Sequence, residues 1–323
     1  MSPASRNSSA KKTYSFLGPV GTFTELALAQ VAEAKGAIWH AAANVQEVID
    51  DVVSGRAVRG VIPVENSVEG GVSATLDALA ATENIRIFGE YLVPITFDLV
   101  APAGVAIKDV QTIATHPVAY AQTNKWVTEN IGAHAYLPTP STAAAAASLL
   151  VEGGAVADAA IAASTITKHY KLKVLAKNIG DNKHAQTRFI QIGLAGSTVG
   201  KSGSPVATGR DKTSVIVELP SDRPGALLEL LEQFATRGVN LSRIESRPIG
   251  DRLGRYRFNI DAQGHIGDAA VAEALKGLHR FSPNVLFLGS YPRADKQKSE
   301  HEGNNSNVEF GSAEAWLKAI RAK

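Results

Sequence analysis

Cysteine is absent from this chain of 323 residues. A chain without thiols has no disulfide bonds, no thiolate nucleophile and no cysteine-ligated zinc or iron–sulfur centre. An excess of charge of one sign is also missing, because 33 basic side chains stand against 31 acidic ones and the formal net charge is only +2. This balance argues against nucleic acid or an anionic membrane as a partner.

Long apolar runs are lacking as well. No uninterrupted apolar stretch reaches the roughly 18 residues that a membrane-spanning helix needs. The segment from Met1 to Lys12 is polar and has no apolar stretch of the signal-peptide kind. These features predict a cytoplasmic protein. The composition, 45% hydrophobic and 20% charged, is that of a soluble chain, and the length predicts two or three compact units.

Strand and helix patterns alternate through the first 195 residues. Strands are predicted at 14–17, 38–41, 60–64, 90–101, 112–115, 159–162, 174–176 and 187–192, and helices at 22–34, 45–54, 72–81, 117–129 and 141–153. Such alternation favours right-handed βαβ units and a mainly parallel sheet. Two α/β lobes with crossing connections would leave a cleft, which is the usual place for a small ligand.

The pattern changes after a segment rich in glycine, serine and threonine. Gly196 to Lys212 has no periodicity and is interpreted as a linker. Strands are then predicted at 213–219, 239–246, 256–261 and 285–290, with helices at 224–237 and 268–278. The order βαββαβ is typical of a ferredoxin-like domain. The tail from 293 to 323 is polar, with a short terminal helix expected at 313–322.

Polar side chains cluster where predicted strands end, and each cluster has two readings. The turn at Gly18–Glu25 is either an anion site at a helix start or an ordinary cap. Asn66 and Ser67 suit a carboxylate ligand, or belong to a capped loop. His116 is either a general base or a helix cap, and Arg188 either binds a carboxylate or forms an ion pair.

No second histidine or carboxylate stands at a helical ligand spacing from His116, which argues against a metal there, and no Gly-x-Ser-x-Gly nucleophile motif occurs in the sequence. The residues by themselves therefore predict a cleft that binds a small anion, in an enzyme or a binding protein, together with a small regulatory domain.

Taken together and in this order, the clusters resemble the prephenate dehydratase family over about residues 13 to 291. The segments that carry the resemblance are Gly21-Thr22-Phe23-Thr24-Glu25, Val64-Glu65-Asn66-Ser67, Thr75-Leu76-Asp77, Thr115-His116-Pro117 with Gln122, Ser141-Thr142-Ala143 and Thr187-Arg188-Phe189. The C-terminal part resembles a phenylalanine-responsive ACT domain through Gly225-Ala226-Leu227-Leu228 and Glu245-Ser246-Arg247-Pro248. The chain departs from the family at Thr24, where serine is common, and at Thr123, where cysteine is common.

The resemblance implies an α/β fold with a two-lobed catalytic domain like a type II periplasmic binding protein, followed by a ferredoxin-like βαββαβ ACT domain. The catalytic domain would span 13–195, with lobe 1 at about 13–92 and 178–195 and lobe 2 at about 93–177. A linker at 196–212, the ACT domain at 213–292 and the tail at 293–323 would complete the chain.

The activity implied by the resemblance is decarboxylative dehydration of prephenate to phenylpyruvate, under allosteric control by phenylalanine, in a homo-oligomer that is a dimer or a tetramer. No cofactor or metal is expected, because aromatisation of the ring drives the reaction. The resemblance assigns catalysis to Thr187, Asn66 and Gln122, with Thr187 acting on the leaving hydroxyl. It assigns substrate binding to Thr22, Glu65, Ser67, Thr115, Ser141, Thr142, Arg188 and Phe189. Phenylalanine would bind at Gly225, Ala226, Leu227, Leu228, Asn240, Leu241, Glu245 and Ser246.

Two alternatives remain open at this point. One is an arogenate dehydratase, which acts on the transaminated substrate. The other is a solute-binding or sensor protein with the same two-lobed fold and no catalysis. The roles of His116 and Glu65 are also undecided, since a carboxylate beside a dianionic substrate would repel it.

Overall fold

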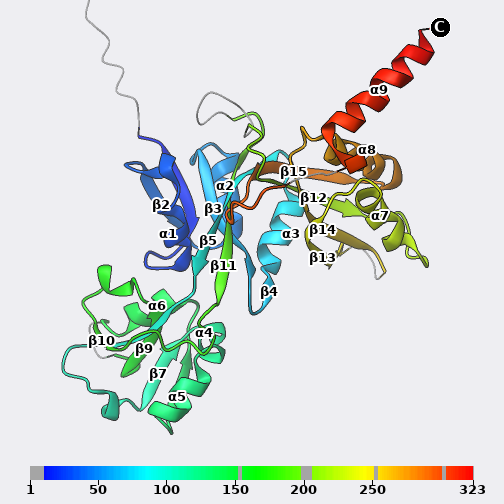
Figure 1. Ribbon diagram of the computed structural model, residues 1–323. Helices are drawn as coiled ribbons and strands as arrows, with labels where there is room; N and C mark the ends of the chain where they lie inside the picture. Colours follow the sequence, from blue (N-terminus) through cyan, green and yellow to red (C-terminus); the bar gives the residue numbers. More distant parts are fainter. Residues whose placement is uncertain (1–10, 152–154, 198–205, 251–253, 300–302, 323) are drawn as a thin grey trace, which may run out of the picture. The chain divides into compact units, whose positions relative to one another are not determined.

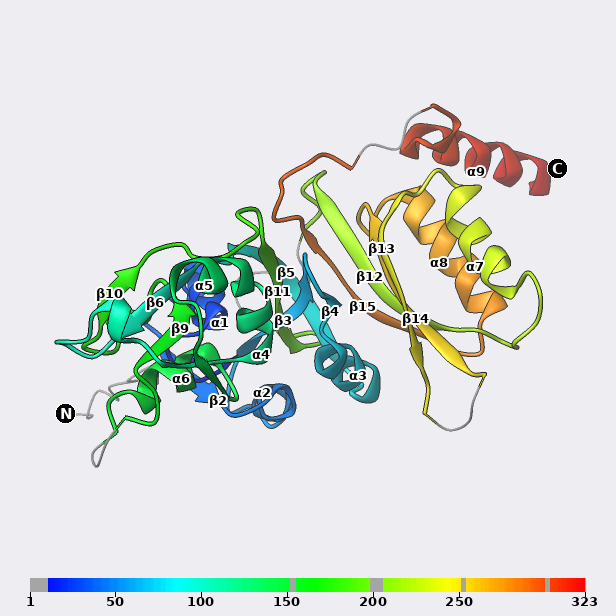
Figure 2. The ribbon, with the colours of Figure 1, turned by 90° about the horizontal axis from the view of Figure 1, so that it is seen from below.

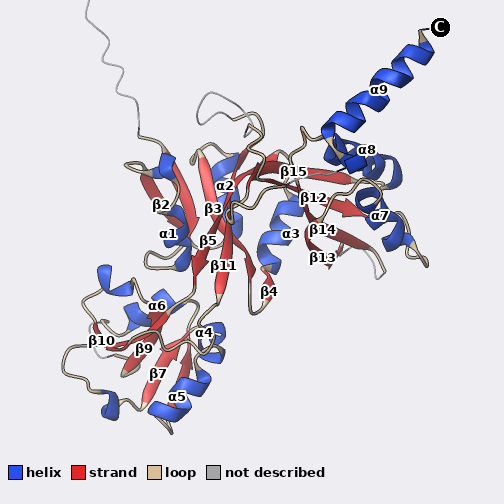
Figure 3. Cartoon of the chain, in the orientation of Figure 1, coloured by secondary structure: helices blue, strands red, loops and turns tan. Residues whose placement is uncertain are grey.

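A computed structural model describes residues 11–151, 155–197, 206–250, 254–299 and 303–322 of the chain. Contacts divide these described residues into two compact units. The first lies within Met1–Gly70 and Tyr91–Phe189, and the second within Gly71–Glu90 and Ile190–Lys323. Figure 1 traces the chain in sequence colours and Figure 3 separates its helices from its strands.

The first sheet has six strands in the order β2-β1-β3-β11-β5, with β4 paired to β3. Its strands are β1 (Thr13–Leu17), β2 (Ile38–Ala42), β3 (Arg59–Asn66), β4 (Gly70–Gly71), β5 (Ile85–Pro94) and β11 (Gln186–Leu194). β1 runs parallel to both β2 and β3, as the strand–helix alternation predicted. Tyr14, Phe16 and Val61 are fully or almost fully buried, as is usual for central strands covered on both faces.

The helices that follow its first strands along the chain are α1 (Phe23–Leu28), the 3-10 turn η1 (Ala32–Ala34), α2 (Val45–Val53) and α3 (Ser73–Ala81), of which α3 belongs to the second unit. Asn44 caps α2, as its position suggests, by accepting a 2.9 Å hydrogen bond from the amide of Glu47. The single helix predicted at 22–34 is wrong: α1 ends at Leu28, where the amide of Gln30 already bonds to the carbonyl of Ala27 in a tighter turn.

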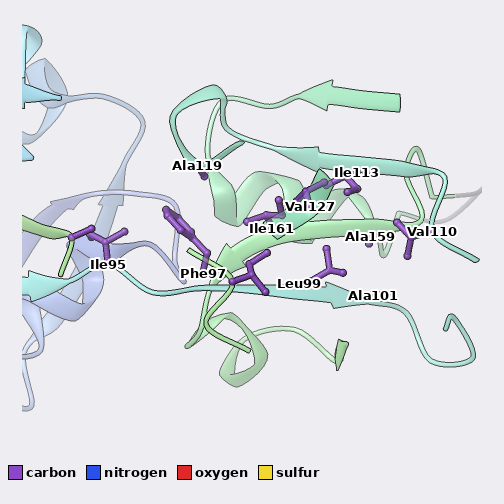
Figure 4. Close-up of a cluster of buried hydrophobic side chains, with 12 residues drawn as sticks. Ile95, Phe97, Leu99, Ala101, Val110, Ile113, Ala119, Val127, Ala159 and Ile161 are labelled. Atoms are coloured by element: carbon purple, nitrogen blue, oxygen red, sulfur yellow. The ribbon is translucent and has the colours of Figure 1, made fainter. Parts of the chain in front are cut away.

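The second sheet has five strands in the order β10-β6-β9-β7-β8. They are β6 (Phe97–Ala101), β7 (Thr112–Thr115), β8 (Ala135–Pro138), β9 (Ala159–Ala163) and β10 (Lys173–Ala176). β7 is parallel to β8 and β9, whereas β6 is antiparallel to β9 and β10. Figure 4 shows its core, in which Leu99, Ile113 and Ile161 are fully buried. This sheet is therefore mixed, because β6 runs antiparallel to both of its neighbours.

The helices of this part are α4 (Pro117–Ala121), α5 (Asn124–Asn130) and α6 (Thr142–Ser148), with the 3-10 turns η2 (Ile107–Asp109) and η3 (Ile166–Lys168). One helix was predicted at 117–129, but the structure divides it at Thr123. The Thr123 hydroxyl donates to the carbonyls of Ala119 and Tyr120, and the residue leaves helical geometry with φ −127°. The helix predicted at 141–153 ends at Ser148, and its expected Gly153–Gly154 stop lies outside the described residues.

The third sheet has four antiparallel strands in the order β13-β14-β12-β15. Its elements are β12 (Asp211–Glu218), α7 (Ala226–Ala235), β13 (Leu241–Pro248), β14 (Tyr256–Gln263), α8 (Ala269–Phe281) and β15 (Val285–Pro292). The predicted βαββαβ order is confirmed. β12 begins at Asp211, inside the linker predicted at 196–212, of which residues 198–205 lie outside the described part.

The two helices α7 and α8 cover one face of this sheet (Figure 2). Leu230 and Phe234 from α7 pack with Val271 from α8 against strand residues such as Val217 and Ile260. The opposite face meets the Gly71–Glu90 segment of the same unit, which contains α3 and the first part of β5. Gly289 of β15 comes so close to β5 that an added Cβ would lie 2.6 Å from the Ile87 carbonyl oxygen.

The tail contains a longer helix than the sequence indicated. After the 3-10 turn η4 (Gly303–Asn305), α9 (Asn307–Arg321) starts well before the predicted 313, because Ser306 accepts a hydrogen bond from the amide of Glu309 and caps it. Phe310 packs on the core of the third sheet. Within the described residues, none of the helices combines the length and the apolar character needed to cross a membrane.

Candidate functional site

The ends of β3 and β11 bring together two residues that the sequence singles out. Asn66 is the last residue of β3, and Thr187 is the second residue of β11. The Asn66 side-chain amide donates a 3.0 Å hydrogen bond to the Thr187 hydroxyl oxygen. Thr187 is only 7% exposed, so its hydroxyl is shielded from bulk water. The carboxyl ends of sheet strands are where α/β proteins bind ligands.

The loop that follows β3 is fixed by its own polar groups. The Asn66 side-chain oxygen accepts hydrogen bonds from the amides of Val68 (2.8 Å) and Glu69 (3.4 Å). Ser67 donates its amide to the Gln186 carbonyl, and the Ser67 hydroxyl accepts from the Gln186 amide, both at 2.9 Å. Asn66 therefore has both ends of its side chain engaged, and Ser67 joins the loop to the start of β11.

Arg188, which follows Thr187 on β11, forms an ion pair with Glu65, which precedes Asn66 on β3. The Arg188 Nε lies 3.3 Å from Glu65 Oε2, and the arginine side chain is 8% exposed. Successive residues of a strand point to opposite faces, so Arg188 does not share a face with Thr187. This geometry favours the ion-pair reading of Arg188. The pairing also keeps the Glu65 charge neutralised near the site.

Gln122 is held rigidly while its amide has no protein partner. It ends α4, its carbonyl accepts a 2.7 Å bond from the Asp181 amide, and Asp181 in turn caps the start of α5 through the amides of Lys125 and Trp126. The residue is 8% exposed, yet neither polar atom of its side chain has a hydrogen-bond partner among the described residues. A buried amide in this state is costly unless a ligand or water satisfies it.

The polar side chains near β7 and α6 form hydrogen bonds with the protein backbone. Thr115 is fully buried and donates to the Ile161 carbonyl at 2.7 Å. His116 caps α4, because its Nδ1 accepts from the Val118 amide at 3.3 Å. Ser141 caps α6 by accepting from the Ala144 amide at 2.9 Å. The capping readings of His116 and Ser141 thus match the geometry.

At the Gly18–Glu25 turn, the Glu25 carboxylate pairs with two groups of the protein. The Gly21 amide donates to the Glu25 carboxylate, and Glu25 also lies 3.1 Å from His169 Nε2. The carboxylate therefore occupies an amide that the anion-site reading would have left for a ligand. Thr22, the predicted ligand contact of this turn, donates its hydroxyl to the Leu17 carbonyl at 3.3 Å. No local pattern could indicate the Glu25–His169 pair, since their contact depends on the tertiary fold.

The remaining predicted substrate residues, Thr142 and Phe189, are both buried. Thr142 is the first residue of α6 and is 9% exposed. Phe189 lies in β11, on the same face of the strand as Thr187, and packs with Tyr14 and Phe16 in the core of the first sheet.

The segment proposed for an effector lies at the start of α7. Gly225 precedes the helix with φ +85°, a conformation that favours glycine. Ala226 is buried, whereas Leu227 and Leu228 are 39% and 60% exposed, which is unusual for leucine. Ser246 and Glu245 are neighbours on β13 and point to opposite faces. The Glu245 carboxylate pairs with Arg243, 2.5 Å away.

Comparison with known proteins agrees with this layout. A family model described as prephenate dehydratase matches residues 14–196, and one described as ACT domain matches 213–280. The prephenate dehydratase of Amycolatopsis methanolica is 40% identical over 306 residues, which cover 95% of this chain and 97% of that protein.

Solved structures extend the comparison to three dimensions. The prephenate dehydratase of Arthrobacter aurescens in complex with L-Phe is 51% identical, with a TM-score of 0.90 over 96% of this chain and 100% of that one. GqqA, described as a novel type of quorum-quenching acylase, is 28% identical, with a TM-score of 0.75 over 87% of this chain and 98% of that one. The catalytic part has the periplasmic-binding-protein-like fold, as the sequence predicted. With a family model covering more than half of its length and a relative matched almost end to end, the chain belongs to the prephenate dehydratase family and carries an ACT domain.

Proposed function

We propose that this chain is a carbon–oxygen lyase that converts prephenate to phenylpyruvate, carbon dioxide and water. The electron pair of the breaking carbon–carboxylate bond enters the ring while the ring carbon–oxygen bond breaks on the other side. The leaving hydroxide takes a proton from the solvent and departs as water. Because the ring becomes aromatic, the protein needs to hold the dianion and stabilise the departing oxygen, without an electron sink.

The observation that carries this proposal is the hydrogen bond from Asn66 to Thr187. By donating to the threonine oxygen, the Asn66 amide occupies a lone pair and leaves the threonine O–H free to point elsewhere. A neutral hydroxyl is a weak acid, so Thr187 acts as a hydrogen-bond donor to the leaving oxygen. A donor fixed in advance and shielded from water stabilises developing charge more strongly than solvent does.

The side chain of Gln122 is the second observation that supports this proposal. Its buried amide lacks a protein partner within the described residues. An unsatisfied buried polar group costs about 1–3 kcal/mol. A substrate with carboxylate and hydroxyl oxygens would remove that cost on binding. Binding of such a substrate thus explains why this glutamine is buried without a protein partner, although the arrangement lowers the stability of the fold.

The other substrate-binding assignments fall into two kinds. We propose that Ser67, Thr115, Ser141 and Thr22 act mainly by positioning, because the described hydroxyl contacts of all four are with the backbone. Arg188 with Glu65 keeps the region electrically balanced next to the dianion. Thr142 and Phe189 complete the proposed set.

Phenylalanine is the proposed effector of the ACT domain. The Arthrobacter aurescens relative was solved with L-Phe and is 51% identical. The amides at the start of α7, from Gly225 to Leu228, would hold the carboxylate of the amino acid. Asn240, Leu241, Glu245 and Ser246 would complete the pocket, and the exposed Leu227 and Leu228 suit an apolar side chain.

A homo-oligomer, dimer or tetramer, is the proposed assembly, and the cytoplasm the proposed compartment. α9 supports the assembly, because Trp316 and Ile320 lie one turn apart and are 66% and 49% exposed. Glu309 lies in the first turn of the helix, whereas Lys318 and Arg321 lie in its last turn. An antiparallel second copy of α9 would cover the apolar stripe and match acids with bases.

The test is an assay of purified protein with prephenate, arogenate and no substrate. Phenylpyruvate formation from prephenate, faster than turnover of arogenate, is the expected result. A faster reaction with arogenate would show that arogenate, rather than prephenate, is the substrate. Tight prephenate binding without product would favour a sensor, and hydrolysis of an N-acyl substrate instead would favour the activity described for GqqA.

A further inference from the structure

A single carboxylate on α3 holds two arginines of the third sheet. Asp77 Oδ2 lies 2.6 Å from Arg247 Nη2, and Asp77 Oδ1 lies 2.7 Å from Arg257 Nη2. Arg247 also donates to the Ser73 hydroxyl at 3.0 Å. All four residues belong to the same compact unit. Charge-assisted bonds of this multidentate kind fix geometry more strictly than single hydrogen bonds do.

The two arginines need Asp77 in order to lie together. Arg247 on β13 stands directly opposite Arg257 on β14, so both side chains leave the same face of the sheet. Like charges directly opposite each other on a sheet are destabilising. Asp77 lies against both of them, and their hydrogen bonds hold its pKa below its usual range despite partial burial. The carboxylate therefore fastens α3 to this face.

A second contact lies at Gly71, just before the start of α3. A Cβ added at Gly71 would overlap the Glu245 carboxylate, so the glutamate side chain packs directly on the glycine backbone. Glu245 and Arg247 are both on the face of β13 that carries these contacts. β13 thus contacts the segment at Gly71, at Ser73 and at Asp77, along the whole entry to α3.

The same segment continues directly into the proposed catalytic residues. Gly70–Gly71 forms β4, which pairs with β3. The Asn66 side chain fixes the intervening turn through the amides of Val68 and Glu69, and its other end donates to Thr187. Every step from Asp77 to Thr187 is therefore a hydrogen bond, a strand pairing or a short stretch of chain.

We infer that β13 of the ACT domain passes effector occupancy to Asn66 and Thr187 through its contacts with Gly71, Ser73 and Asp77. This inference rests on the proposed function. β13 is an edge strand. Ser246, a proposed effector residue, points to one of its faces, and Arg247 points to the other together with Glu245, which is also assigned to the effector. A ligand that favours one position of β13 changes how the Gly71–Asp77 segment is held, and with it the direction of the Asn66 amide. Asp77 is a positioning residue in this scheme.

The experiment uses the full chain with Asp77→Asn, Arg247→Gln and the double variant. Glu273→Gln is the matched control, because it removes an exposed ion pair with Lys276 on α8 of the same domain. Phenylalanine binding is measured by calorimetry, and the change in prephenate turnover on adding phenylalanine is measured separately. Coupling between sites typically amounts to about 5- to 150-fold in affinity.

The expected result is that both single variants still bind phenylalanine while the response of turnover falls at least fivefold. The double variant should lose no more than either single variant, because the two residues act as one unit. The Glu273→Gln control should keep the full response. An unaltered response in Asp77→Asn, or additive losses in the double variant, would overturn the inference.

A second readout separates this inference from the proposed function. Amide hydrogen exchange at residues 66–71 should change when phenylalanine is added to the unaltered chain, even if prephenate is not a substrate. That change should vanish in Asp77→Asn. If Asp77→Asn does not fold, Arg247→Gln provides the same test, because it breaks the same contact from the side of β13 and should uncouple exchange at 66–71 from phenylalanine binding. Phenylalanine-dependent exchange that persists in a folded variant would contradict the inference.

Discussion

The amide of Asn66 donates to the hydroxyl of Thr187 at 3.0 Å, although 121 residues separate the two in sequence. The contact joins the end of β3 to the start of β11, so it exists only when the first sheet is complete. Thr187 thereby has a fixed orientation before substrate arrives. Preorganisation of this kind is what a donor to a leaving oxygen requires.

Removing the Thr187 hydroxyl should lower kcat with little effect on folding. Loss of one preorganised donor typically costs about 10²–10³-fold in kcat. Thr187→Ala should therefore fall in that range, while Thr187→Ser, which keeps the hydroxyl, should stay within about tenfold of the unaltered chain. Steady-state kinetics with prephenate and thermal unfolding of each variant provide the measurement. Near-normal turnover in the alanine variant would remove Thr187 from the proposed chemistry.

Replacing Gln122 by leucine should separate binding from stability. The buried amide has no protein partner among the described residues, so an apolar side chain of similar size relieves a cost of about 1–3 kcal/mol. We expect Gln122→Leu to have an equal or higher Tm and a raised KM for prephenate. A purely structural glutamine would give the reverse pattern, with lower stability and unchanged KM.

The ion pair between Glu90 and Lys212 should be costly to break. The Lys212 Nζ lies 2.9 Å from Glu90 Oε2, and both side chains are less than 10% exposed. Glu90→Gln leaves the ammonium buried without its counter-charge, and such changes typically cost about 3–5 kcal/mol. Urea unfolding should detect this loss.

The matching double variant serves as the control for this pair. Glu90→Leu with Lys212→Met removes both charges together, and replacement of a whole buried pair by apolar residues is often neutral or stabilising. Its free energy of unfolding should lie well above that of Glu90→Gln. Equal destabilisation of the two would show that lost packing, rather than an unpaired charge, dominates.

Asp51 should contribute stability that depends on pH. Burial raises the pKa of its carboxyl, but hydrogen bonds from Ser15 and Arg56, both 2.7 Å long, outweigh burial and hold the pKa below its usual range. A carboxyl whose pKa is lower in the folded state stabilises the fold above its unfolded pKa, near about 4. That contribution disappears as the pH falls through the folded pKa.

The difference in unfolding free energy between the unaltered chain and Asp51→Asn isolates this contribution. We expect the difference to be largest at neutral pH, about 1.5–3 kcal/mol for bonds to a charged group, and to shrink below about pH 4. Urea titrations at pH 7, 5 and 3.5 would measure it. A difference that does not change with pH would contradict a lowered pKa of Asp51 in the folded state.

Local sequence patterns predicted where helices and strands lie better than they predicted which elements contact each other. The alternation of β12 and the cap at Asn44 follow from side-chain periodicity and capping chemistry, which act within a few residues. The break at Thr123 was missed because a threonine inside a helical pattern bends the chain only when its hydroxyl turns back to the carbonyls of Ala119 and Tyr120.

The candidate site shows the same difference between local features, which the sequence indicates, and tertiary contacts, which it does not. Asn66 and Thr187 stand out in the sequence as members of polar clusters, but their mutual contact depends on strand order. The pairing of Arg188 with Glu65 and of Asp77 with two arginines is likewise set by tertiary packing. The segment 71–90 groups with the C-terminal part of the chain for the same reason, although it precedes much of the catalytic part in sequence.

The most direct measurement is phenylpyruvate formation by the unaltered chain and by Thr187→Ala at saturating prephenate, with and without phenylalanine. We expect rapid product formation by the unaltered chain, a rate that changes when phenylalanine is added, and almost no product from the variant. Prephenate consumed equally fast by both proteins, or by neither, would contradict this expectation.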